Sequence, residues 1–337
     1  MSHTFIIAEL SANHNHNLAT AVESIKAAAA IGVDAVKIQT YTADTITLDC
    51  RNENFLIRGG LWDGYSYYDL YKEAYTPWEW HEELFHVARE EGVVMFSTPF
   101  DNTAVDLLAS LDNPIYKIAS FEIMDTELIS YAASKGRPMI ISTGIATEQE
   151  IDEAIAACHA VGNHDITLLK CTSEYPARIA DANLSMIPAM RQRFACPVGL
   201  SDHSMGSTVP MVAVALGATV VEKHFILDRS IGGPDSGFSM DRNEFATLVR
   251  DIRDAESSLG TPEFRLTPAI EHSRLSGRSL YVSADIPAGA TLTRDNIRCV
   301  RPGNGLHPRH LHEVLGRRAA RHLPFGTPLT LTDLLPQ

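Results

Sequence analysis

Short apolar runs alternate with amphipathic segments along most of the chain. The runs are rich in Val, Ile and Leu and too short for helices, which predicts strands. The predicted strands are 5–10, 35–39, 93–97, 115–118, 139–142, 166–170, 198–200 and 220–223. Helical spacing of apolar residues is found in 18–31, 79–91, 103–111, 126–134, 148–161, 207–216 and 242–259. Eight strands alternating with helices predict an α/β protein with a closed (β/α)₈ TIM barrel. The open doubly wound alternative uses fewer strands and a Gly-rich first turn, which this sequence lacks.

One long connection, 41–77, separates the second predicted strand from its helix and is rich in Tyr, Trp, Asp and Gly. A connection of this length is usually functional or disordered, and its aromatic content argues against disorder. In a barrel it would follow the carboxyl end of a strand and lie over the active site. A packed surface loop without a role is the alternative.

The pattern changes after residue 260, where Pro and charged residues replace the helical period. The chain then holds an internal repeat, because 286–297 resembles 323–334 in its Pro-x-Gly turn and the Thr/Leu strand that follows. We predict a catalytic barrel in 1–262, a linker in 263–277 and a small, pseudo-symmetric β-rich domain in 278–337. A domain of that size has a thin core, so we expect it to dock on the barrel or on a partner subunit.

Composition narrows the possible functions. The 337 residues include 28 Lys and Arg against 42 Asp and Glu, a net charge of −14, which disfavours binding to nucleic acid. No apolar run reaches the roughly 20 residues of a membrane helix, and no signal peptide is visible at the N-terminus. The five cysteines form no CxxC pair. We therefore expect a cytoplasmic protein that acts on a small molecule and binds neither nucleic acid nor membrane.

Polar residues that suit a metal site stand at the ends of three predicted strands. His203 ends the seventh strand, His224 the eighth and Glu9 the first. Barrel closure puts the first strand beside the eighth, so these side chains can converge. Two imidazoles and a carboxylate without a thiolate favour Mn²⁺ or Mg²⁺ over structural Zn²⁺. The alternative is that each histidine is structural.

Two lysines lie within predicted strands, where a buried ammonium is costly unless it meets an anion. Lys37 and Lys117 have apolar neighbours, and the hydroxyls of Thr98, Ser120 and Ser142 stand at nearby strand ends. Together with backbone N–H groups at 143–144, these groups predict a cradle for phosphate or carboxylate. The alternative is that the lysines pair with Asp or Glu inside the barrel.

A set of motifs in fixed order resembles one known family. The motifs are IAELSANH (7–14), VKIQT (36–40), FSTPF (96–100), YKIAS (116–120), ISTG (141–144), LKCTSEYP (169–176), GLSDH (199–203), VEKHF (221–225), GPDS (233–236) and RPGNG (301–305). Together they resemble the bacterial sialic acid synthases over essentially the whole chain, and the tail resembles the antifreeze-like (SAF) domain of those enzymes. Segments 13–17 and 61–81 are most similar to the members that form pseudaminic acid.

The resemblance implies condensation of phosphoenolpyruvate with an acyclic aldehyde sugar, 2,4-diacetamido-2,4,6-trideoxy-L-altrose, with release of phosphate by C–O cleavage. It implies a divalent metal, Mn²⁺ before Mg²⁺ or Co²⁺, on His203 and His224, which with Glu9 form the expected catalytic set. Phosphoenolpyruvate would be held by Lys37, Thr98, Lys117, Ser120, Ser142, Ser173, Tyr175 and Ser201. Gln39 and Asp235 would face the sugar, and Arg301 would reach the other barrel of a domain-swapped homodimer.

Two departures bear on the sugar. N-acetylneuraminate synthases commonly carry Asn where this chain has Ser173, and a Gly-containing Asn-His-x-Gly where it has 13–16. We therefore expect a different sugar, read by His14, His16 and the loop 62–68.

Alternative functions are another nonulosonate synthase, for N-acetylneuraminate or legionaminate, and a Schiff-base aldolase with Lys170 as the nucleophile. An ice- or carbohydrate-binding role for the tail is disfavoured by its many arginines.

Overall fold

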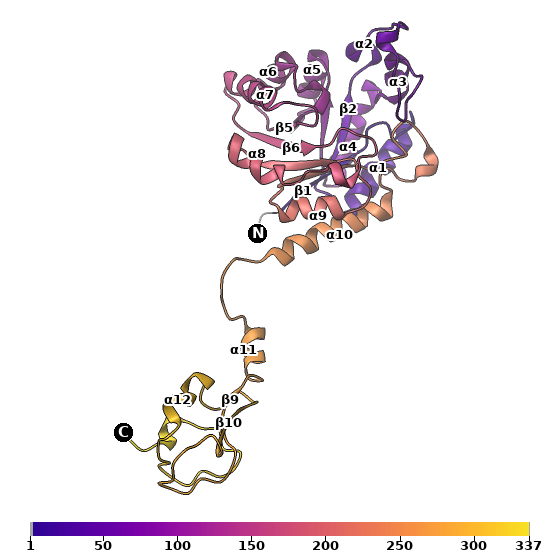
Figure 1. Ribbon diagram of the computed structural model, residues 1–337. Helices are drawn as coiled ribbons and strands as arrows, with labels where there is room; N and C mark the ends of the chain where they lie inside the picture. Colours follow the sequence, from indigo (N-terminus) through magenta and orange to yellow (C-terminus); the bar gives the residue numbers. More distant parts are fainter. Residues whose placement is uncertain (1–2, 337) are drawn as a thin grey trace. The chain divides into compact units, whose positions relative to one another are not determined.

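The computed structural model describes residues 3–336, which form two compact units that divide between Gly260 and Thr261 (Figure 1). Each unit is described by itself below. The division falls close to the predicted end of the barrel at residue 262.

The first unit is a closed barrel of eight parallel strands in chain order. The strands are β1 Phe5–Glu9, β2 Ala35–Thr40, β3 Val94–Pro99, β4 Tyr116–Ile118, β5 Met139–Ser142, β6 Ile166–Cys171, β7 Val198–Asp202 and β8 Val220–His224. β1 closes the barrel by pairing with both β2 and β8, and Glu9 lies in register with Lys37 on one side and His224 on the other. The predicted barrel and all eight strands are therefore confirmed.

Side chains alternate between the inside and the outside of the barrel. One buried cluster fills the interior near the middle of the strands and includes Ile7, Phe96 and Val220. The strand residues directly next to these interior ones, such as Ile6 beside Ile7 and Val221 beside Val220, belong to the larger cluster that packs under the helices. Because successive strand residues point to opposite faces, the residue two positions beyond each interior one points into the barrel mouth.

Eight helices cover the barrel: α1 Leu18–Ile31, α4 His81–Glu90, α5 Asn102–Ser110, α6 Thr126–Ala133, α7 Glu148–Ala160, α8 Met186–Phe194, α9 Thr208–Ala215 and α10 Arg242–Leu259. Their starts are fixed by side-chain caps where the sequence offers them, as at Asn17, Asp101 and Thr147. The sequence did not predict α8, because Pro188 and a polar stretch at 191–193 interrupt its apolar period.

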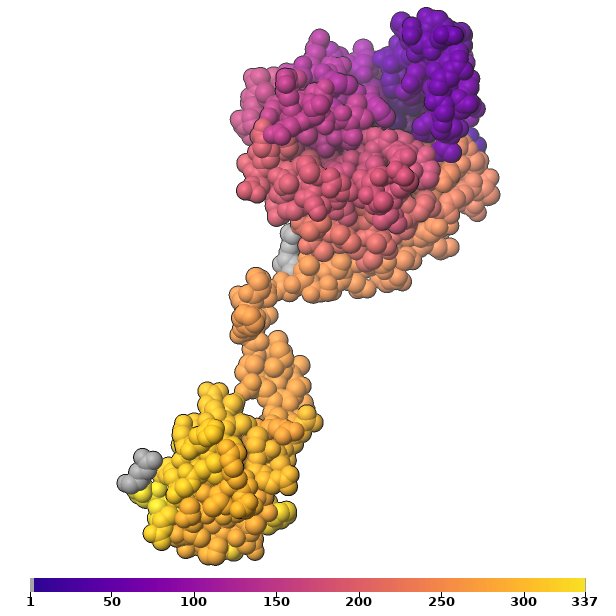
Figure 2. Space-filling model, viewed as in Figure 1, coloured from indigo at the N-terminus to yellow at the C-terminus, as the bar shows by residue number. Residues whose placement is uncertain are grey.

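The long connection after β2 is folded rather than a plain loop. It contains α2 Ala43–Ile46, a 3₁₀ turn at Glu53–Phe55, α3 Tyr67–Ala74 and a second 3₁₀ turn at Trp78–Trp80. α2 packs on α3, and the lobe that holds them stands out in indigo in Figure 2. We call residues 41–77 the insertion.

The second unit contains α11 Pro268–Arg274, β9 Ser279–Val282, β10 Ile297–Val300 and α12 Leu311–Val314, with 3₁₀ turns at Pro308–His310 and Leu331–Asp333. α11 lies within the segment that we predicted as a linker. β9 and β10 form an antiparallel pair, and further contacts are isolated bridges rather than long strands. This is a less regular β structure than the sequence predicted.

The internal repeat has a structural counterpart. Ile286 and Leu323, which open the two copies, donate their N–H groups to each other's carbonyl oxygens at 2.9 Å each. The next pairs follow the same relation: Leu292 donates to Arg317 at 2.8 Å, and its counterpart Leu329 donates to Leu280 at 2.9 Å. The two copies are thus related by a pseudo-twofold axis, as expected from the repeat.

In the part of the chain that the structure describes, none of the helices combines the length and the apolar character needed to cross a bilayer.

Candidate active site

Four buried charged side chains meet at the carboxyl end of the barrel. Lys37 forms an ion pair with Glu9 and lies 3.8 Å from Glu222 Oε1, and Lys117 lies 3.6 Å from the same oxygen. All four are at most 6% exposed. In this ligand-free arrangement the lysines pair with carboxylates inside the barrel, which is the alternative that the sequence left open.

The charges in this cluster perturb one another. Burial alone would raise the pKa of Glu222, but the ammoniums of Lys117 and Lys37 outweigh it and hold the pKa below its usual value. Burial would lower the pKa of Lys37, but Glu222 and Glu9 outweigh that effect and raise it. Burial prevails at Lys117, whose pKa is lowered, and at Glu9, whose pKa is raised. Such a cluster of perturbed groups in a cleft is typical of a functional site.

The predicted hydroxyls lie around the lysines. Thr98 accepts a hydrogen bond from Lys37 at 3.1 Å, and Ser120 accepts one from the backbone N–H of Gly144 at 3.1 Å. Ser201 donates to Glu222 at 3.4 Å. The hydroxyl of Ser142 is buried and has no hydrogen-bond partner among the described residues. A buried polar atom left without a partner usually marks a place for water or ligand.

Gly144 keeps space open at this cradle. A methyl group at its Cα would lie 2.1 Å from Ser173 Oγ and 2.8 Å from Ser120 Oγ. A larger residue would therefore displace these serine hydroxyls, one of which accepts the N–H of Gly144.

The two predicted metal-binding imidazoles are neighbours. The rings of His203 and His224 have centroids 5.4 Å apart and are at least nine-tenths buried. The carbonyl oxygen of Thr172 lies 2.9 Å from His203 Nδ1. Because a carbonyl only accepts hydrogen bonds, Nδ1 must carry the proton that it donates, and Nε2 is the nitrogen that can offer a lone pair to a metal. His224 Nδ1 is buried without a partner among the described residues. Two adjacent buried imidazoles fit the ligand preference of a divalent cation.

Glu9 does not complete a three-residue metal cluster, contrary to the prediction that it would converge with the imidazoles. Its carboxylate is paired with Lys37 and accepts a hydrogen bond from Gln39 at 2.9 Å. Between residues 3 and 336, the structure has no group of three or more His, Cys, Asp or Glu in a metal-ligating arrangement. The reason is electrostatic: the nearby ammonium on β2 attracts the carboxylate more strongly than the neutral ring of His224.

A cavity of about 540 Å³ opens over this site, within the size range of small-molecule sites. Predicted residues that line it are Gln39, Ser173, Tyr175, His224 and Asp235. Asp235 is buried and accepts from the N–H of Ala12 at 3.3 Å, and burial raises its pKa. Tyr175 packs on the ring of His203, with centroids 4.3 Å apart.

The insertion forms the remaining wall of this cavity. Trp62 donates its indole N–H to the carbonyl of Pro234 at 3.1 Å, and its ring lies 5.8 Å from that of Tyr175 and 6.3 Å from that of Phe238. Tyr41 and Tyr71 from the same segment also line the cavity. The insertion thus lies over the barrel mouth, as the sequence predicted, and is more than a packed surface loop.

Two residues predicted to read the sugar do not line this cavity. His14 is buried beside Trp80 and hydrogen-bonds Thr76 at 3.1 Å, and burial lowers its pKa to about 4. His16 is exposed and packs against Tyr75. Both follow β1 and contact the last residues of the insertion. Arg301 is exposed within the second unit.

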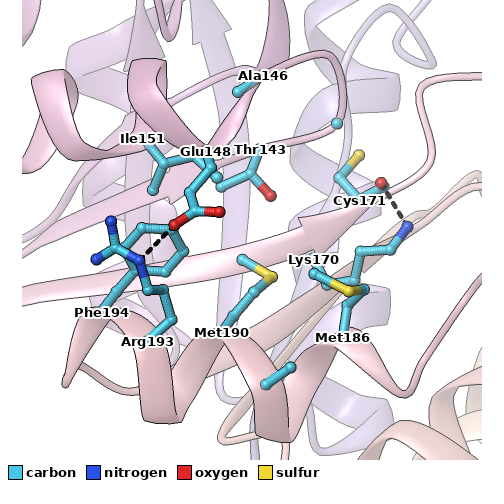
Figure 3. Close-up of a pocket in the computed structure, with 12 residues that line it drawn as sticks. Thr143, Ala146, Glu148, Ile151, Lys170, Cys171, Met186, Met190, Arg193 and Phe194 are labelled. Atoms are coloured by element: carbon cyan, nitrogen blue, oxygen red, sulfur yellow. Dashed lines mark hydrogen bonds and ion pairs between the residues drawn. The ribbon is translucent and has the colours of Figure 1, made fainter.

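A second cavity, of about 470 Å³, lies between β5, β6, α7 and α8 (Figure 3). Lys170 lines it and donates to Cys171 O at 2.8 Å and to Thr172 Oγ1 at 3.1 Å. The side chain of Lys170 leaves β6 on the face opposite to Leu169, which belongs to the barrel interior. The amine of the aldolase alternative is therefore not in the cavity over the barrel mouth.

Sequence reasoning missed three residues of the site. Glu222 is two positions before His224 on β8 and therefore points to the same side, a signal that the sequence contained. Glu122 lines the main cavity from the turn after β4, and burial raises its pKa to about 7. Phe238 packs against the rings of Tyr175 and His224; no spacing rule in the sequence marks either Glu122 or Phe238.

Buried lysines and hydroxyls at the mouth of a (β/α)₈ barrel are typical of an enzyme site for an anionic substrate, and the adjacent imidazoles are of the kind that bind a divalent cation. Comparison with known proteins agrees. The NeuB family model matches residues 24–264 and the SAF domain model matches 277–335. The chain belongs to the NeuB family and carries a C-terminal SAF domain.

The similar proteins include pseudaminic acid synthase from Helicobacter pylori, 48% identical over 98% of this chain and 97% of that protein. Pseudaminic acid synthase from Campylobacter jejuni is 47% identical over 98% of this chain and 96% of that protein. Among solved structures, the N-acetylneuraminic acid synthetase of Leptospira borgpetersenii has a TM-score of 0.72 and 31% identity, covering 80% of this chain and 90% of that one.

Proposed function

We propose that this chain condenses phosphoenolpyruvate with 2,4-diacetamido-2,4,6-trideoxy-L-altrose to give pseudaminic acid and phosphate, a transferase reaction that forms a carbon–carbon bond. The chemistry of this proposal rests on the buried cluster of two lysines and surrounding hydroxyls, of which that of Ser142 is unpaired, beside two imidazoles. The choice of this sugar as the substrate is supported by the near full-length similarity to two pseudaminic acid synthases.

Phosphoenolpyruvate would lie among Lys37, Thr98, Lys117, Ser120, Ser142, Ser173, Tyr175 and Ser201. Entry of a trianion among these groups replaces part of the pairing between the lysines and Glu222 with stronger charge-assisted hydrogen bonds. The unpartnered Ser142 hydroxyl supplies a donor that needs no rearrangement, whereas the N–H of Gly144 already holds Ser120 in place.

A divalent cation, Mn²⁺ before Mg²⁺ or Co²⁺, would be held by His203 and His224. When bound, it supplies Lewis-acid polarisation of the aldehyde oxygen. The remaining coordination positions would be open to water and substrate oxygen, because the protein offers no third ligand among the described residues.

C3 of phosphoenolpyruvate adds to the aldehyde carbon, and positive charge develops at C2. Glu9 would stabilise that charge and accept a proton from the water that adds at C2. Gln39 holds the Glu9 carboxylate in position. Collapse of the tetrahedral carbon breaks the C2–O bond, and Lys37 and Lys117 neutralise the departing phosphate.

The sugar would occupy the rest of the cavity, facing Gln39 and Asp235. His14 and His16 would act on the sugar only indirectly, through the insertion that they contact at Thr76 and Tyr75. An enzyme for N-acetylneuraminate or legionaminate is the second candidate, because the barrel chemistry is the same for all three sugars.

The decisive experiment is phosphate release from phosphoenolpyruvate in H₂¹⁸O with a panel of aldehyde sugars. We expect release only with the 2,4-diacetamido sugar and a divalent metal, abolished by EDTA, with ¹⁸O in the C2 hydroxyl of the product and none in phosphate. Label in phosphate would reject C–O cleavage. A preference for N-acetylmannosamine would move the assignment to the second candidate.

We further propose a cytoplasmic, domain-swapped homodimer in which Arg301 reaches the partner's sugar site through its fork of donors. Mixing a His203→Ala chain with an Arg301→Ala chain tests this. In a swapped dimer the two inactive chains form one intact site, so activity returns on mixing and subunit exchange. Without swapping, each chain keeps its own defect and no activity returns.

A further inference from the structure

The main cavity has two chemically distinct ends. At the barrel end, polar side chains such as Gln39, Ser173 and His224 line it. At the other end, the insertion contributes Ile46, Ile57, Leu70 and Ala74. These four aliphatic side chains offer no hydrogen bond to a ligand.

The aromatic residues of the insertion strengthen this contrast. Tyr41 is 3% exposed and packs edge-on against Phe100 and Tyr71, with ring centroids 5.0 and 5.6 Å away. Burial raises the pKa of Tyr71 to about 12, so its hydroxyl stays neutral. Trp62 has already donated its N–H to Pro234. The insertion therefore lines its part of the cavity mainly with aliphatic side chains and aromatic rings, to which its tyrosines add hydroxyl groups.

We propose that this aliphatic wall, formed by Ile46, Ile57, Leu70 and Ala74, selects a sugar whose far end is a methyl group rather than a hydroxymethyl group. The inference rests on the proposed function, which places the reacting aldehyde at the imidazoles. C1 of an open-chain sugar then lies at the barrel end, and C6 lies at the insertion end. A C6 methyl group buries favourably against the aliphatic side chains, whereas a C6 hydroxyl placed against these four side chains would lose its hydration without gaining a hydrogen bond from them.

The size of the effect follows from the nature of such a wall. An apolar pocket rejects an analogue that adds one hydroxyl by about 10- to 100-fold and no more. The wall thus gives a preference for 6-deoxy sugars, while the acetamido groups would be recognised by other residues.

The test compares two substrates that differ by one oxygen atom: 2,4-diacetamido-2,4,6-trideoxy-L-altrose and its 6-hydroxy analogue. For the wild type we expect kcat/KM to favour the 6-deoxy sugar by about 10- to 100-fold. Ile46→Asn and Leu70→Asn should each reduce that ratio by at least about fivefold, because an amide can pair with the hydroxyl. The KM for phosphoenolpyruvate should stay unchanged, since the wall lies at the opposite end of the cavity.

Leu48→Asn is the matched control, because Leu48 belongs to the insertion, is 65% exposed and does not line the cavity. It should keep the wild-type ratio. Ile46 is less buried than Leu70, so its variant keeps the test available if Leu70→Asn does not fold.

The outcomes separate this inference from the proposed function. If the wild type makes pseudaminic acid but both wall variants keep its ratio, the wall does not select the sugar and the proposed function stands. If the wild type shows no preference between the two sugars, the inference fails as well. If neither sugar reacts with phosphoenolpyruvate while a different one does, the proposed function itself fails.

Discussion

The two cavities of the barrel unit are similar in volume but differ in how their polar groups are satisfied. In the side cavity of Figure 3, Arg193 pairs with Glu148 and Asp152 at 2.5 Å each, and Lys170 is hydrogen-bonded. The other residues that line it are Met, Ala, Ile, Phe and Gly together with Cys171 and Thr143, whose hydroxyl donates to the carbonyl of Leu169 at 3.0 Å.

The site at the barrel mouth is different, because several of its polar atoms have no partner. Ser142 Oγ, Glu122 Oε2, Glu222 Oε2 and His224 Nδ1 are buried without a hydrogen bond among the described residues. Each such atom costs about 1–3 kcal/mol of stability. Several buried polar atoms without partners in one place are typical of a ligand-binding site. Unpaired buried polar atoms therefore distinguish the two cavities better than volume does.

The largest expected effect is loss of the imidazole pair at the barrel mouth. His203→Ala should lose bound metal and lower kcat on the order of 10³-fold, because the aldehyde is no longer polarised. Metal content by mass spectrometry and steady-state rates measure both. Met186→Ala, in the side cavity, should change neither. Full metal content in His203→Ala would reject the ligand assignment.

The lysines of the two cavities give the next contrast. Lys117→Met should lower kcat/KM for phosphoenolpyruvate on the order of 10²-fold, because an anion would then lie in a buried site with one cation fewer. Lys170→Met should stay within about threefold of the wild type, since that lysine lies in the side cavity. Borohydride reduction in the presence of pyruvate should leave no adduct on Lys170. An adduct there would favour the aldolase.

Gly144 lies where the two cavities approach each other, since it lines the side cavity and contacts the serines of the main site. Gly144→Ala should raise KM for phosphoenolpyruvate about 10-fold or more, because its methyl group displaces Ser173 and Ser120. Gly237→Ala is the matched control, because nothing lies within 4 Å of its added methyl group. A KM that is unchanged in Gly144→Ala would mean that the cradle binds no part of this substrate.

The smallest effect concerns stability of the ligand-free protein. The folded-state pKa of Glu122 is about 7, above that of an unfolded carboxyl, so the folded state binds the proton more tightly. Stability therefore falls as pH rises from about 5 to 8. Glu122→Gln removes this dependence and should gain about 2 kcal/mol over the wild type across that window. Urea unfolding at both pH values measures the gain. Glu148→Gln, an exposed position in the side cavity, should show no such pH-dependent gain.

Most of the barrel was predictable because its signals are local. All eight strands were recognised from short apolar runs, and α1 and α10 have their predicted bounds. α8 was missed because its sequence lacks a clear apolar period, and the helices of the insertion were missed because the aromatic residues around them follow no period. Among site residues, Lys37, Lys117, His203 and His224 were found because strand ends gather at one face of a barrel.

The sequence by itself determined which side chains stand at the barrel mouth, since strand alternation and parallel closure leave no freedom there. Only the tertiary structure decided which of them pair. In the folded protein Glu9 pairs with Lys37 rather than with the imidazoles, and Glu222 lies between Lys37 and Lys117. His14 and His16 do not line the cavity. Pairing depends on distances of a few ångströms between residues far apart in the chain. Coulomb energies and desolvation change steeply over such distances, and no local pattern encodes them.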